Sequence, residues 1–373
     1  MMPPHGSQLT LSLLLPDDDH HAARERPAQL QCSSFTPPTA VAMPPVAAAS
    51  SGSAADAVVS TLSASEAVKL LSEPLELPCG KSAPNRLTKA AMAEMLAQLG
   101  GSPPTPALLN LYRQWAYGGW GIVITGNVAV ERTHLGMPFD VSVPQAWTPV
   151  LMAPERETGD KGMSPKLGKA GRAGSAMWPN SNEYERLVKR FRAYADACRP
   201  SLPSGDADAD APAAPLAIVQ LVHAGRQSLR GFGRAPWVRP LAPSAIPMRT
   251  TGALGPLGAF VDWLLWSTPR EMTHADIRAV VNQFAATAKL MADAGFDGVE
   301  IHASHGYLLS AAASPRTNQR TDEYGGSAEG RARMLLEVVA AVRQRVPKDF
   351  VVGVKVSLFP SLCLFFWLRT ADG

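Results

Sequence analysis

Two histidines and a tyrosine follow an apolar stretch in the run 298-GVEIHASHGYLLS-310. His302 and His305 are three residues apart, and Tyr307 comes two residues later. Two imidazoles at one site can donate hydrogen bonds to a single carbonyl or phenolate oxygen and stabilise the negative charge that develops there. A phenolic hydroxyl is a weak acid, which suits Tyr307 to donating a proton to a carbanion-like carbon.

Taken alone, this motif has two simpler explanations. The histidines can close hydrogen bonds at the end of a strand. They can also bind a metal ion, although zinc pairs on a helix prefer H-x-x-x-H spacing and the sequence offers no obvious third ligand. We predict no metal site, because the four cysteines are scattered and form no C-x-x-C pair.

Two more polar residues lie in otherwise apolar stretches. Gln220 lies near the end of the run 216-LAIVQLV-222, and its amide can both donate and accept, which suits the edge of a heteroaromatic ring. Lys355 lies in 350-FVVGVKVS-357, where a buried lysine is costly unless an anionic ligand or a carboxylate pairs with it. Each also has a plain explanation, Gln220 as part of a loop start and Lys355 as a strand-end side chain that reaches solvent.

Strand-like and helix-like stretches alternate along the chain and would position these side chains. The clearest helix is 274–295, where Ile277, Val280, Phe284 and Met291 recur at three- and four-residue spacing. The predicted strands are 86–93, 121–130, 216–222, 297–302 and 350–357, and the predicted helices are 106–119, 182–197, 274–295 and 328–346.

Such alternation predicts a parallel sheet covered by helices, either doubly wound or a (β/α)₈ barrel. No G-x-G-x-x-G follows the first strand, which disfavours the doubly wound alternative. Lys89, Gln220, His302 and Lys355 lie within or at the ends of predicted strands, and a barrel gathers such residues at its C-terminal face. We therefore expect a (β/α)₈ TIM-type barrel, incomplete at about five of the eight strands.

Composition limits the partners. The chain has 373 residues and is 46% hydrophobic, which is enough to bury a core. Its net charge of +3 is too small to indicate that it binds a nucleic acid. No apolar run reaches the roughly 18 residues of a membrane helix. The scattered cysteines are typical of a reducing compartment, so we expect a cytoplasmic protein. Oligomeric state is not predicted.

Several motifs in chain order resemble the signature of the old yellow enzyme family, the NADH:flavin oxidoreductases. They are 85-NR-86, 112-YRQWAYGGWGIVITGNVAV-130, 220-QLVHAGR-226, 269-PREMTHADI-277, and the run from 296-FDGVEIHASHGYLLS-310 through 314-SPRTNQRTDEYGGS-327. The resemblance spans residues 75–357. It implies a barrel that holds FMN at the C-terminal strand ends, with NAD(P)H as reductant. It also implies a small-molecule substrate, such as an α,β-unsaturated carbonyl, whose activated alkene is reduced.

The resemblance also implies roles for individual residues. His302 and His305 would hydrogen-bond the carbonyl oxygen of the substrate, and Tyr307 would donate the proton. Gln220 would contact the flavin ring, and Lys355 would lie near the flavin N1 and O2 atoms. The positions that match backbone contacts to flavin on the first two strands are Ala91, Met92 and Asn127.

One loop motif leaves two interpretations open. Gly325 and Gly326 precede a helix and could cradle a phosphate. We favour a loop tied together by Arg320 and Asp322, because the segment 316–327 is dense in residues that hydrogen-bond one another.

The two ends of the chain depart from this pattern. Residues 1–65 are rich in Ala, Pro and Ser, so we expect a disordered tail that could carry a targeting signal. Residues 66–357 form the expected partial flavin-binding barrel, with a surface loop at 200–215. The apolar tail 358–373 does not resemble the family, in which three further strands close the barrel and supply phosphate ligands.

We expect that tail to cover the open sheet edge, to promote aggregation, or to result from an intron or frame error in the gene model. The alternative function is therefore a truncated, non-catalytic fragment that cannot retain FMN.

Overall fold

The computed structural model describes residues 63–144, 181–199, 214–249, 255–359 and 362–367. The predicted disordered tail and the predicted surface loop at 200–215 lie almost entirely outside these ranges. Within them, no helix combines the length and the apolar character needed to span a bilayer.

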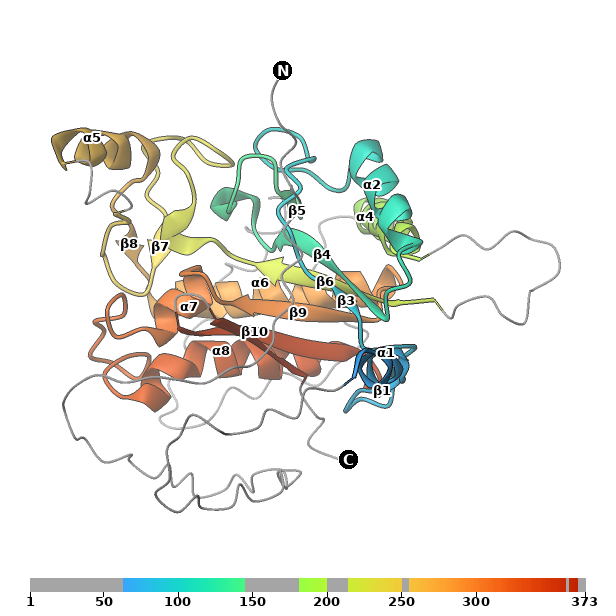
Figure 1. Ribbon diagram of the computed structural model, residues 1–373. Coiled ribbons are helices and arrows are strands. Elements are labelled where there is room, and N and C mark those ends of the chain that lie inside the picture. The colour runs from blue at the N-terminus through green and yellow to red at the C-terminus, as the bar shows by residue number, and fades with distance from the viewer. Residues whose placement is uncertain (1–62, 145–180, 200–213, 250–254, 360–361, 368–373) are drawn as a thin grey trace, which may run out of the picture. The chain divides into compact units, whose positions relative to one another are not determined.

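Five parallel strands form a curled sheet in which spatial order follows chain order (Figure 1). Each strand pairs with the next through a parallel register, and a helix lies between successive strands in the chain. This is the repeating unit of a (β/α)₈ barrel, so the predicted fold class is confirmed as a half-barrel. The strands are β3 (Thr88–Lys89), β4 (Ile122–Ala129), β6 (Leu216–Val222), β9 (Gly298–Ala303) and β10 (Val351–Phe359).

The free edge of β10 is covered by the apolar tail. Strand β11 (Leu362–Trp367) pairs with β10 in the antiparallel direction, with Lys355 opposite Phe365. An antiparallel partner satisfies backbone groups that an open edge would leave exposed, which is one of the arrangements expected for this segment.

Helices cover one face of the sheet and begin where the sequence provides caps. Thr273 and Asp276 form a reciprocal capping box at the start of α6, and Ser327 accepts from the backbone N–H of Gly330 at the start of α8. These caps satisfy donors that a helix start would otherwise leave free. The covering helices are α2 (Pro106–Ala116), α4 (Ser181–Ala197), α6 (His274–Asp293) and α8 (Ala328–Arg343).

Short elements complete the described structure. The hairpin β1–β2 adds Leu77 to an apolar cluster with Ile122, Ile218 and Val351 on the face of the sheet opposite the helices. We call this face the inner face. The remaining elements are α1 (Ala64–Ser72), β1 (Leu75–Glu76), β2 (Ser82–Ala83), β5 (Val141–Ser142), β7 (Leu241–Ala242), α5 (Gly255–Leu265), β8 (Arg270–Glu271) and α7 (Leu308–Ala313).

The predicted element boundaries agree with the structure except at the first strand. The sequence predicts a strand over 86–93, but only Thr88–Lys89 pair with β4. Met95 has a φ of 56°, and Glu94 accepts hydrogen bonds from the Gly126 backbone and the Tyr112 hydroxyl. These contacts hold the chain beside β4 in an irregular path that the apolar pattern does not indicate.

The largest apolar cluster lies between the sheet and the helices, and we expect it to supply most of the stability. Met334 of α8 is 3% exposed in this cluster, whereas Leu336 of the same helix is 62% exposed. Met334→Ala should lower the free energy of unfolding in urea by about 2–5 kcal/mol. Leu336→Ala is the matched control and should change it by less than about 0.5 kcal/mol. Equal effects would contradict this packing.

Candidate active site

Polar side chains gather on the inner face of the sheet, in two neighbouring rows. Asn127, Gln220 and Glu300 are direct partners across β4, β6 and β9. His302 and Lys355 are partners in the next row toward the C-terminal strand ends. The residues that alternate with them on these strands are valines, leucines and isoleucines of the helix-facing cluster. Because alternate residues of a strand share a face, the two rows face the barrel interior together.

The turn after β9 brings His305 and Tyr307 back toward His302. His305 and Gly306 both have positive φ, at 56° and 76°, so the chain reverses within two residues. The ring centroids of His302 and His305 are 5.1 Å apart, and those of His302 and Tyr307 are 4.9 Å apart. The turn is held by the His305 backbone N–H, which donates to the Ser357 hydroxyl at 3.2 Å. The three predicted catalytic side chains thus form one cluster.

Hydrogen bonding fixes which nitrogen of His302 is a donor. The backbone N–H of Ser304 donates to His302 Nδ1 at 3.2 Å, so Nδ1 carries a lone pair and Nε2 carries the proton of the neutral ring. Burial, reinforced by the charge of Lys355, holds the pKa of His302 well below its usual value. The same two causes lower the pKa of His305. Both rings are therefore neutral donors at neutral pH.

Tyr307 is kept in its protonated form. Burial raises the pKa of Tyr307, and the negative charge of nearby Asp140 adds to the effect. The Tyr307 hydroxyl and an Asp140 oxygen would both lie 3.0 Å from a Cβ placed on Gly136, so glycine there leaves room for the pair. A protonated phenol in this position can donate a proton to a neighbouring carbon or oxygen.

Two buried groups of the inner face have no hydrogen-bond partner within the described residues. They are the amide nitrogen of Gln220 and both carboxylate oxygens of Glu300. Buried polar atoms are nearly always satisfied, so unsatisfied ones indicate a place for a ligand. An amide donor and the Lys355 ammonium on one face suit the carbonyl and nitrogen edge of a flavin ring, so the residues present fit FMN.

The other predicted flavin contacts lie beside this face. Ala91 packs against the inner apolar cluster, and the side chain of Met92 is exposed. The Met92 carbonyl oxygen would lie 2.2 Å from a Cβ placed on Gly126, so the 91–94 segment runs directly against β4 next to Asn127. Only glycine allows this approach, and the sequence analysis did not single out Gly126.

Lys89 does not join the polar rows, which corrects the sequence analysis. It pairs with Val123, whose side chain faces the helices, and its ammonium donates to the Tyr112 hydroxyl at 3.2 Å and to the Ile124 carbonyl at 3.1 Å. The ammonium also lies 4.3 Å from the ring centre of Trp115. Burial lowers the pKa of Lys89 to about 8. The side chain therefore bridges β3 and α2 behind the sheet.

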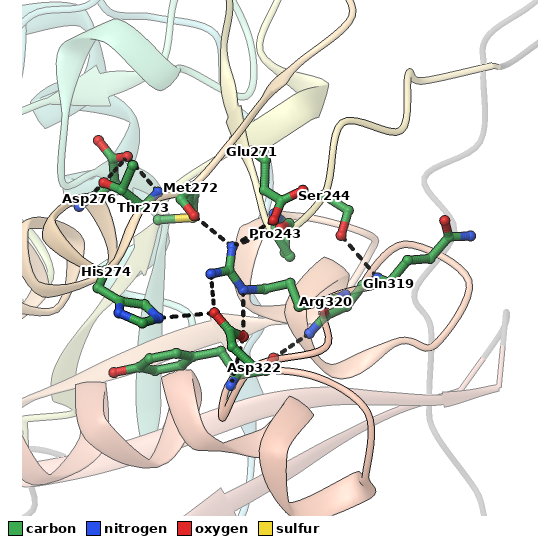
Figure 2. Close-up of polar contacts among 12 residues, drawn as sticks. Pro243, Ser244, Glu271, Met272, Thr273, His274, Asp276, Gln319, Arg320 and Asp322 are labelled. Carbon is green, nitrogen blue, oxygen red and sulfur yellow. Dashed lines mark hydrogen bonds and ion pairs between the residues drawn. The ribbon is translucent and has the colours of Figure 1, made fainter.

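The glycine-containing loop after α7 is tied together as the second interpretation predicted. Arg320 donates to Asp322 Oδ1 at 2.9 Å and to the carbonyls of Pro243 at 3.2 Å and Met272 at 2.5 Å, as Figure 2 shows. A Cβ on Gly325 would lie 2.1 Å from the Arg320 carbonyl oxygen, so this glycine packs against the loop itself. The loop thus anchors α7 and α8 to the β7–β8 pair.

A buried cluster of Glu131, His134 and His223 has ligand atoms close enough for a metal ion. Backbone N–H groups of Leu241 and Gly225 donate to His134 Nε2 and His223 Nδ1, at 3.1 Å each. The opposite ring nitrogens, which face Glu131 at 3.2 and 3.3 Å, therefore carry the protons. Protonated nitrogens have no lone pair for a metal, so the cluster is a hydrogen-bonded brace.

The fold and the polar rows define a (β/α)₈-type protein with its site at the C-terminal strand ends. Residues 213–362 match the model of the NADH:flavin oxidoreductase / NADH oxidase family. The chain belongs to this family. Membership confirms the predicted resemblance, and the relatives reported next are named NADH-dependent flavin oxidoreductases.

Relatives and solved structures agree with this assignment. The chain is 37% identical over 286 residues to the NADH-dependent flavin oxidoreductase iliE of Neonectria sp. (strain DH2), covering 76% of this chain and 31% of the relative. It is 36% identical to the protein of that name from Hypocrea jecorina (strain QM6a), covering 78% of this chain and 61% of the relative. It thus spans less than two thirds of the length of either relative.

The old yellow enzyme homologue of Zymomonas mobilis shares the fold, with a TM-score of 0.51 and 23% identity, covering 77% of this chain and 62% of that chain. The structure of morphinone reductase matches with a TM-score of 0.50 and 23% identity, covering 77% of this chain and 61% of that chain.

A substitution of Arg320 tests whether its hydrogen bonds anchor the loop between α7 and α8. Arg320→Met should leave the Pro243 and Met272 carbonyls without their donor and lower the free energy of unfolding by about 1–3 kcal/mol. Amide hydrogen exchange should also accelerate across 314–327. Arg316→Met, an exposed position in the same loop, is the control and should have little effect. If the two variants exchanged alike, the anchoring role would be wrong.

Proposed function

We propose that this chain carries the flavin- and substrate-binding part of an FMN-dependent oxidoreductase that reduces activated alkenes, such as α,β-unsaturated carbonyls, with NAD(P)H as the source of hydride. The observation that supports it is the gathering of His302, Tyr307, Gln220 and Lys355 around one inner face. The names of the flavin oxidoreductase relatives support the same class of reaction. A cytoplasmic location stays a prediction.

Five residues would hold the cofactor. The Gln220 amide has an unused donor for a ring carbonyl, and Lys355 offers positive charge to the N1 and O2 edge. Ala91 and Met92, in the segment after β3, and Asn127 of β4 would border the same space. Bound there, FMN would supply the two-electron chemistry that carries hydride from NAD(P)H to the β-carbon of the alkene.

The histidines and the tyrosine would act on the substrate. His302 Nε2–H and the His305 ring would donate to the carbonyl oxygen, where negative charge grows as hydride arrives at the β-carbon. Both rings donate as neutral groups, so they supply hydrogen bonds and keep their own protons. Tyr307 would then transfer its proton to the α-carbon, and solvent would reprotonate it.

Flavin retention is the first test. The purified chain, incubated with FMN and then desalted, should remain yellow with about one flavin per chain by absorbance. Lys355→Met should weaken FMN binding roughly 10- to 100-fold, because a charged hydrogen-bond donor is lost. Lys348→Met, an exposed lysine before β10, is the matched control. A colourless wild-type chain would instead favour the fragment that cannot retain FMN, with β11 occupying the β10 edge.

Phenol binding tests the oxyanion site directly. Simple phenols mimic the enolate oxygen, and their binding perturbs the flavin spectrum. His302→Ala in the FMN-loaded chain should weaken phenol binding roughly tenfold or more, because one of two donors to a single oxygen is lost. His274→Ala, on the outer surface of α6, should leave the affinity unchanged. Unaltered phenol affinity in His302→Ala would contradict the proposed role.

A further inference from the structure

Glu300 is a buried carboxyl for which the proposed reaction has no use. It is 1% exposed and lies in the middle of β9, on the same inner face as His302. Neither carboxylate oxygen has a hydrogen-bond partner within the described structure. An ionised carboxylate in such a place is strongly disfavoured, so the group either takes up a proton or is compensated by a nearby charge.

The groups that face Glu300 come from its own strand and the two neighbouring strands. On β6 its register partner is Gln220, which is not ionisable, and on β10 it is Gly353, which has no side chain. Lys355, two residues further along β10, brings the positive charge that acts on Glu300. Further titratable groups of this face are His302 on β9, whose pKa burial lowers, and His305 and Tyr307, whose rings lie against it. Within the described residues, Lys355 is the charge that acts on the pKa of Glu300.

The balance between burial and Lys355 leaves the carboxyl near its titration point. Burial raises the pKa of Glu300 to about 7, while the Lys355 charge lowers it and so limits the rise. A raised pKa means that the folded chain holds this proton below about pH 7 and releases it above. The Lys355 charge also contributes to lowering the pKa of His302.

We propose that Glu300 is a positioning residue whose exchangeable proton sets how much of the Lys355 positive charge is available to a cofactor on the inner face. When ionised, Glu300 neutralises Lys355. When protonated, it no longer offsets the Lys355 charge and can itself donate a hydrogen bond to a ligand. The effect on a cofactor rests on the proposed function. The titration of the Glu300 proton near neutral pH is a property of the chain alone.

The ligand-free arm is infrared spectroscopy of the full chain from about pH 5 to about pH 9. The wild type should show carboxylic C=O absorption that disappears with a midpoint near pH 7, and Glu300→Gln should lack the component that belongs to Glu300. Asp140, whose pKa burial also raises to about 7, is the control, because Asp140→Asn should remove a different component. Lys355→Met should move the Glu300 midpoint to higher pH.

Two results would contradict the proposed titration of Glu300 beside Lys355. One is the absence of a titrating band that depends on Glu300, and the other is an unchanged midpoint in Lys355→Met. If Glu300→Gln failed to fold, the comparison of wild type with Lys355→Met would still decide, because the shift of the midpoint identifies the carboxyl that faces the lysine.

The second arm uses the FMN-loaded chain, reduced anaerobically with dithionite at about pH 8, where Glu300 is ionised. Dithionite supplies two electrons, the ring takes them up with one proton and gains one negative charge, and Glu300 should take a second proton from solvent. The carboxylic band should therefore grow on reduction in wild type and stay absent in Glu300→Gln. If FMN binds and is reduced without this growth, the inference fails while the proposed function stands. If FMN does not bind, the proposed function fails, and the ligand-free experiment still tests whether Glu300 titrates near pH 7.

Discussion

The register of hydrogen bonds between β6, β9 and β10 decides which side chains meet in this protein. It places Gln220 opposite Glu300 and His302 opposite Lys355. Because side chains alternate between faces, a slip of one residue would turn all four toward the helices and bury charges among valines. The helix-facing cluster resists such a slip, since the same slip would move its apolar residues into the barrel interior.

Stability and chemistry are therefore divided between the two faces of one sheet. The outer face buries an apolar cluster against α2, α4, α6 and α8 and supplies the favourable burial free energy. On the inner face, burying Gln220 and Glu300 with incomplete hydrogen bonding and burying the Lys355 ammonium both cost free energy. A flat, polar ligand that satisfied these groups would recover part of that cost on binding.

The sequence predicted the strands and helices well where periodicity was strong. The long runs at 216–222 and 274–295 reappear as β6 and α6 within two residues at each end. The sequence did not predict the face of the sheet on which Lys89 lies. A strand of two residues shows no alternation of polar and apolar residues, and the face is set by pairing with β4. The closeness of His302, His305 and Tyr307 follows from their short spacing, whereas their roles come from the family resemblance and remain proposals.

The sequence did not predict contacts between residues that are far apart in the chain. Glu131 and His223 are 92 positions apart, and no local pattern links them. Glu300 lies two residues before His302, but a single glutamate between Val299 and Ile301 is typical of a strand whose polar residues alternate with apolar ones. Only the register and the unsatisfied oxygens distinguish it. The helix-side position of Lys89 and the brace at Glu131 likewise follow from packing.

The central claim is that one ligand touches side chains from three different strands of the inner face. A crystal structure of the chain with FMN and a phenol would test it most directly. We predict the flavin ring within hydrogen-bonding distance of Gln220 and Lys355, with the phenol oxygen between the rings of His302 and His305. A flavin bound on the helix side of the sheet, or a phenol distant from both histidines, would contradict it.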